Sequence, residues 1–139
     1  MAGYKGDYLE DKVLDHCVGR ASFTMPTTYV ALFTDSANLP EIAGGTLTNE
    51  VSTAGTAYAR VATSGKWAAA GSGSITTNAD IEFATATANW GTVSFFAIMD
   101  GDTEGSDNVL YCGDITTPKA VNTDDTAKFA SGDITITES

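Results

Sequence analysis

The chain has 139 residues, 42% of them hydrophobic and 18% charged, which is typical of one globular domain held together by its own core. Seven Lys and Arg residues against 18 Asp and Glu residues give a formal net charge of −11. This excess of acids disfavours nucleic-acid binding, which requires clustered basic side chains. No run approaches the roughly 20 apolar residues of a membrane span, so membrane insertion is not expected either. We therefore predict a single domain over residues 1–139.

The first 15 residues are polar and acidic and lack the basic, apolar and small-residue regions of a signal peptide. We expect the chain to be made in a cytoplasm and not to be exported by that route.

Residues 7–18 carry the clearest helical pattern. Asp7 can accept hydrogen bonds from the first-turn N–H groups, and Glu10, three residues later, completes a capping box. Because so short a helix is marginal by itself, we expect its apolar face to lie on the rest of the molecule. That face is formed by residues at helical spacing: Leu9, Val13, Leu14, Cys17 and Val18.

Beyond the helix the apolar residues alternate with a period of two, which indicates strands. Residues 28–34 (TYVALFT) are apolar on both faces, so this strand is predicted to be central and buried on both sides. Residues 91–99 and 109–112 form a predicted hairpin around a polar turn. Several short strands at regular spacing predict an antiparallel β-sandwich with one short N-terminal amphipathic helix. The predicted strands are 28–34, 57–63, 80–85, 91–99, 109–112, 126–130 and 133–137.

The segment 35–55 is rich in Gly, Thr, Asn and Ala and has no sustained pattern, so it is interpreted as a long loop. Structureless loops of this length in compact domains are usually functional or ordered by a partner. The loop is therefore a candidate assembly surface.

His16 is the only histidine, so any Ser-His-Asp or Cys-His arrangement must use it. Its neighbour Cys17 points about 100° away around the helix, which makes direct activation geometrically poor. We interpret His16 as an ordinary helix-edge residue and predict that the protein is not an enzyme. No cofactor is predicted.

The turn 100–107 resembles the first half of a calcium loop. Asp100, Asp102 and Glu104 alternate along it, and Gly105 occupies the sixth position. The twelfth position, however, is Tyr111 where a bidentate Glu is needed. A solvated acidic turn is the main interpretation, and a calcium site at Asp100, Asp102 and Glu104 is the alternative.

Trp67, Trp90 and the tyrosines offer a possible sugar-binding surface. Aromatic residues in small β domains more often belong to the core, so a glycan site is the weaker interpretation.

Several blocks of the sequence, in order, resemble small virion proteins of tailed bacteriophages that are often described as tail fibre or minor structural proteins. The resemblance covers nearly the whole chain, but none of its blocks encodes a chemical mechanism. The blocks are GDYLEDKVLDHCVGR (6–20), TYVALFT (28–34), AYARVA (57–62), IEFATATANWGTVSFFAIMD (81–100) and LYCGDITTPKAVNTDDTAKFASGDITI (110–136).

The resemblance implies a non-enzymatic structural subunit of a virion that is assembled in the cytoplasm of the bacterial host. Since one domain of this length has no shaft, we expect an exterior accessory subunit: a capsid decoration or cement protein, or a neck or tail protein. The expected partners are other copies of the chain, with a trimer as one possibility, and other virion proteins such as the major capsid or tail protein. The alternative is a receptor- or glycan-binding tail fibre module.

Cys17 and Cys112 stand where this family pattern leads us to expect larger apolar residues. From the residues alone, they are either two buried small hydrophobes or a disulfide within or between subunits. Both interpretations are kept.

Overall fold

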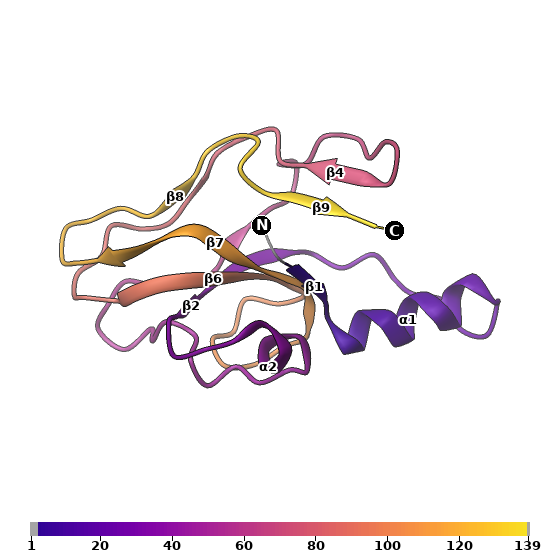
Figure 1. The fold of residues 1–139 in the computed structure, drawn as a ribbon, viewed down its shortest axis with the longest axis horizontal. Helices are drawn as coiled ribbons and strands as arrows, with labels where there is room; N and C mark the ends of the chain where they lie inside the picture. The colour runs from indigo at the N-terminus through magenta and orange to yellow at the C-terminus, as the bar shows by residue number, and fades with distance from the viewer. Residues whose placement is uncertain (1–2, 139) are drawn as a thin grey trace.

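The structure, a computed structural model that describes residues 3–138, is built on one five-stranded antiparallel sheet with the strand order β1-β7-β6-β2-β3 (Figure 1). Two ribbons of two strands each complete the β structure, β4 with β9 and β5 with β8. The strands are β1 (Gly3–Lys5), β2 (Tyr29–Thr34), β3 (Val61–Ala62), β4 (Ser74–Thr76), β5 (Ile81–Glu82), β6 (Gly91–Met99), β7 (Val109–Val121), β8 (Lys128–Phe129) and β9 (Thr135–Thr137), and the helices are α1 (Asp7–Cys17) and α2 (Leu39–Ala43).

Strand β2 lies inside the sheet and is buried on both faces, as its sequence predicts. Val30 and Leu32 belong to the core on one face, and Ala31 and Phe33 belong to the core on the other. None of the four is more than 1% exposed. Because consecutive side chains of a strand point to opposite faces, an uninterrupted apolar run requires cover on both sides of the sheet.

Different elements pack on the two faces of the sheet. Residues of the two ribbons, such as Ile81, Phe129 and Ile134, pack on one face of the sheet, and α2 packs on the other. The mainly-β class with a short N-terminal helix is confirmed, and the second layer of the sandwich consists of the two ribbons.

The segment 35–55 is not entirely loop, because it contains α2. Asn38 caps this helix by accepting a hydrogen bond from Glu41 N at 3.0 Å, and Pro40 suits the first turn. Leu39, Ile42 and Ala43 are buried against the sheet. Five residues are too few for a hydrophobic period to be visible in the sequence.

Several of the strand predictions need correction. The predicted strand 109–112 is too short, since β7 runs to Val121; Ile115–Pro118 bulge out opposite the single residue Ser94 and need no regular ladder there. The predicted strands 126–130 and 133–137 are shorter in the structure and lie in different ribbons, because β8 pairs with β5 and β9 with β4.

Helix α1 is attached at its beginning and extends away from the body (Figure 1). The Gly6 N–H donates to Leu110 O at 2.7 Å, and a Cβ on Gly6 would lie 2.0 Å from Val109 O, so the backbones approach more closely than any other residue allows. Leu9 is the buried residue of the helix. Within residues 3–138, no helix has the length and apolar character needed to cross a membrane.

Candidate functional site

The most elaborate polar cluster is a buried ion pair between Arg60 and Glu50. Arg60 Nε donates to Glu50 Oε2 at 2.8 Å and Arg60 Nη2 donates to Glu50 Oε1 at 2.7 Å. The side chains of Arg60 and Glu50 are 0% and 1% exposed. The Tyr58 hydroxyl donates to Glu50 Oε2 at 2.7 Å, and its pKa is raised by burial and by the Glu50 charge. Although burial opposes the charged form, the hydrogen bond and charge of Glu50 raise the pKa of Arg60.

This ion pair fastens the turn between β6 and β7 to the sheet. Arg60 also donates to Gly101 O at 2.9 Å and Ser106 O at 3.0 Å, while Gly105 N donates to Glu50 Oε1 at 3.0 Å. Every strong donor and acceptor of the pair is used, as a buried charge requires. The cluster is closed to solvent and is structural. The partner of Arg60 was not identified in the sequence, although Glu50 is the one acid between Glu41 and Asp80.

Two of the three residues of the calcium hypothesis are occupied by other contacts. Asp100 accepts from Asn108 N at 2.7 Å and from its amide at 2.9 Å, and Glu104 accepts from Thr53 N at 3.1 Å. Asp102 is exposed. Among the residues that the structure describes, no group of three or more His, Cys, Asp or Glu side chains is placed to hold a metal ion. Calcium binding therefore stays a prediction, for which the described residues do not bring a set of ligands together.

His16 lies at the exposed end of α1, where its Nδ1 accepts a hydrogen bond from Phe23 N at 3.1 Å. This contact folds the chain back after the helix, so the ring has a local structural role.

The two cysteines are both free thiols and occupy different environments. Cys17 is exposed on α1, whereas Cys112 is buried in β7 against the α2 side of the sheet. Burial raises the pKa of the Cys112 thiol to about 11. Cys112 thus matches the interpretation as a buried hydrophobe, and Cys17 does not.

The aromatic residues considered for sugar binding belong mainly to the core. Trp90 is buried, and its Nε1 donates to Thr56 O at 2.9 Å. Tyr58, Phe83 and Trp90 pack on one another, with ring centroids 5.4 to 6.3 Å apart. Trp67 is partly buried against the same cluster. Tyr4 is 47% exposed, but neither tryptophan offers the exposed platform that the glycan interpretation requires.

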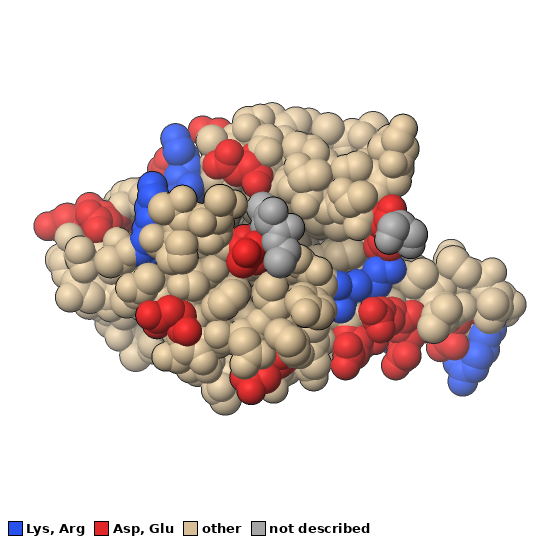
Figure 2. Space-filling model, in the orientation of Figure 1, with Lys and Arg blue, Asp and Glu red and all other residues tan. Residues whose placement is uncertain are grey.

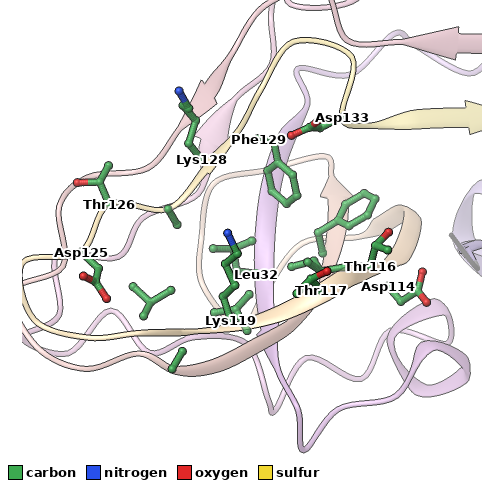
Figure 3. Close-up of a pocket in the computed structure, with 16 residues that line it drawn as sticks. Leu32, Asp114, Thr116, Thr117, Lys119, Asp125, Thr126, Lys128, Phe129 and Asp133 are labelled. Atoms are coloured by element: carbon green, nitrogen blue, oxygen red, sulfur yellow. The ribbon is translucent and has the colours of Figure 1, made fainter.

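An open groove of about 650 Å³ lies between the bulged half of β7 and the segment 125–133, and we call it the β7–β8 groove (Figure 3). Apolar side chains such as Leu32, Phe96 and Phe129 line it, and Lys119 rises from β7 into the space beneath β8. The groove was missed in the sequence because it is created by the β7 bulge and by the β5–β8 pairing, neither of which has a local sequence signal. The lining residues are Leu32, Val93, Phe96, Asp114–Thr117, Lys119–Val121, Asp125–Phe129 and Asp133.

A second group of side chains, which we call the α1 tip, comprises Leu14 and Val18 at the end of α1 and Met25 in the loop that follows it. These side chains are 64%, 78% and 89% exposed, the largest values among the large exposed apolar residues of the described chain. The helix protrudes from the body, and acidic side chains follow one side of it (Figure 2). The prediction that the apolar face of α1 lies on the molecule therefore holds for Leu9 and fails for Leu14 and Val18.

The geometry so far describes a compact β domain without a gathered catalytic or metal centre among residues 3–138, but with an apolar protrusion and a groove. A search of curated proteins found no match. The resemblance to virion proteins of tailed bacteriophages is confirmed, because the family model described as podophage GP4 fiber I protein gp80 matches residues 5–137, and the chain belongs to this Gp80 family.

Proposed function

We propose that this chain is a non-enzymatic accessory subunit on the outside of the virion, at the neck or tail, that acts through surface contacts with other copies and with other virion proteins. Membership of a podophage fibre family supports a structural role in the particle. The observation that carries the finer proposal is the α1 tip, since Leu14, Val18 and Met25 are exposed and contribute little to the fold. Apolar side chains gathered on a protruding helix are typical of surfaces that become buried in an assembly.

The polar chemistry of the molecule fits this role. The Arg60–Glu50 pair is sealed in the core, His16 supports a turn, and the Cys112 thiol is kept neutral by burial. Each of these groups has a structural task, which supports a protein that holds a shape and makes no bonds.

Electron microscopy of intact particles tests the proposal. Particles carrying the wild-type chain should show density for this fold on the exterior at the neck or tail, with α1 directed at a neighbouring subunit. Particles made with Leu14→Glu/Val18→Glu should lack this density although the variant is produced and folded. As a matched control, Ala69→Glu/Ala70→Glu adds the same two charges at exposed positions away from α1 and should be incorporated normally.

Location inside the capsid, or full incorporation of the α1 variant, would contradict the proposal. Density on the head surface would retain an accessory role but would refute the neck or tail position.

A further inference from the structure

We propose that the α1 tip of one copy inserts into the β7–β8 groove of the next, so that copies associate head to tail. The inference rests on the proposed function and deepens it by naming the two surfaces. It starts from one chain that carries both an uncovered apolar protrusion and an open groove with an apolar floor.

The first support is the match in polarity. Leu14, Val18 and Met25 are exposed apolar side chains on and just after a protruding helix, and the groove exposes parts of the half-buried side chains of Ile115, Ala127 and Phe129. Transfer of apolar surface from water into such a groove is favourable by about 25 cal/mol per Å². A cavity of about 650 Å³ is in the range that receives several side chains.

The second support is charge. Lys119 lies in the groove and has no ion-pair partner among the described residues. Helix α1 carries Glu10 and Asp11, which likewise have no ion pair there. Figure 2 shows basic and acidic side chains together at the β7–β8 end of the molecule and a row of acidic side chains along one side of α1. Lys119 gives the acids of α1 one cation to meet in the groove, where it stands beside the acids Asp114, Asp125 and Asp133 of the same lining.

The third support is an unsatisfied atom. Asp114 lines the groove, and its Oδ1 is buried without a hydrogen-bond partner in the described chain. Buried polar atoms are nearly always paired, with protein groups or ordered water, so this oxygen can accept from water or from a donor of a second copy. Lys12 and Arg20 on and after α1 are long donors that the second copy brings to the groove.

The arrangement determines the kind of assembly. Helix α1 extends from one end of the long axis, and the β7–β8 groove lies toward the other end (Figure 1). In the head-to-tail arrangement each copy uses its tip and its groove on two different neighbours, a heterologous contact that produces a closed ring or an open filament. A reciprocal exchange between two copies would instead close a two-fold dimer.

Mixing two blocked variants in solution tests the inference. Leu14→Glu/Val18→Glu blocks the tip, and Thr117→Glu/Ala120→Glu blocks the groove; all four positions are exposed, so both variants should melt like the wild type. By sedimentation velocity we expect the wild type to form species larger than a dimer and each variant alone to be monomeric. An equimolar mixture should form a dimer and nothing larger, because it contains one intact tip and one intact groove. The Ala69→Glu/Ala70→Glu control should associate like the wild type.

A mixture that stays monomeric, or a wild type that is monomeric at high concentration, would overturn the head-to-tail contact. Either result leaves the exterior location untouched, since that is decided on intact particles. A variant that associates alone would show that its surface is not the interface and would equally overturn the inference.

Discussion

At the scale of single residues, the Arg60–Glu50 pair is the point at which one change should matter most. Arg60→Met leaves the Glu50 carboxylate buried without its cation, whereas Glu50→Gln leaves Arg60 its second ion pair, to Asp107 at 3.2 Å. Breaking a buried pair by removing one partner costs about 3–5 kcal/mol. Urea unfolding should therefore show Arg60→Met destabilised by this order and Glu50→Gln by less, with the double variant destabilised by less than the sum of the two.

Exposed pairs provide the control for this prediction. Arg20→Ala removes the exposed contact to Asp15 and should change the free energy of unfolding little, because exposed ion pairs contribute at most about 1 kcal/mol. Equal effects of Arg20→Ala and Arg60→Met would show that the Arg60–Glu50 pair is not the anchor of the turn 100–108.

The two thiols should differ sharply in reactivity. With a pKa of about 11, the Cys112 thiol in the folded protein is almost entirely protonated at pH 8, and it is also buried. A thiol reagent at pH 8 should therefore modify one equivalent rapidly in the native protein and two after unfolding. Cys17→Ser should abolish the rapid phase; a rapid phase that persists would contradict the burial of Cys112.

The raised pKa of the Cys112 thiol also makes the stability of the fold depend on pH. The neutral thiol is favoured in the folded state, so its contribution to stability is complete below the pKa of the unfolded thiol and is lost as pH rises toward about 11.

At the scale of elements, α1 should divide into a half that supports the fold and a half that does not. Leu9 is 5% exposed in the core, and Leu9→Ala should cost about 2–5 kcal/mol of unfolding free energy. Leu14→Ala, at 64% exposure, should change it by less than about 0.5 kcal/mol. Thermal unfolding followed by circular dichroism measures both. A large loss from Leu14→Ala would show that the α1 tip packs on its own chain, which would remove the basis for assembly through it.

The elements differ in how much of them the sequence predicts. Strands 28–34 and 91–99 were located to within one residue, because long apolar runs bounded by turns leave little freedom. Helix α1 was located by its apolar spacing, but the predicted capping box at Asp7 and Glu10 does not form, because Gly6 is the N-cap residue and no side chain caps the helix. The ribbon strands have two or three residues each, and their partners are set by long-range contacts that no local pattern contains.

The candidate surfaces show the same limit. The apolar face of α1 is visible in the sequence. Whether the rest of the molecule covers that face depends on the direction in which the helix extends from Gly6. The β7–β8 groove depends on four residues of β7 facing the single Ser94, an irregularity in register that composition does not reveal. Glu50 and Arg60 stand out as isolated charges, but only the fold brings them together.

At the scale of the whole molecule, net charge should control association. Each copy carries −11, so two copies repel at long range while the proposed apolar contact attracts only when they touch. Salt shortens the range of the repulsion, with a Debye length of about 30 Å at 0.01 M and about 8 Å at 0.15 M. It also weakens the attraction between Lys119 and the acids of α1, but this local attraction is smaller than the repulsion between the full charges.

We therefore expect the average mass in sedimentation to increase as salt is raised from low to physiological strength. Lys119→Ala should lower the mass at each salt concentration, because it removes the groove cation and makes the net charge more negative. Lys66→Ala makes the same change in net charge at a position outside the groove and is the matched control. If Lys119→Ala and Lys66→Ala lower the average mass equally, net repulsion alone governs association and the groove is not the contact surface. If Lys119→Ala has the larger effect, the groove is where the copies meet, and its acidic partner should be sought on α1.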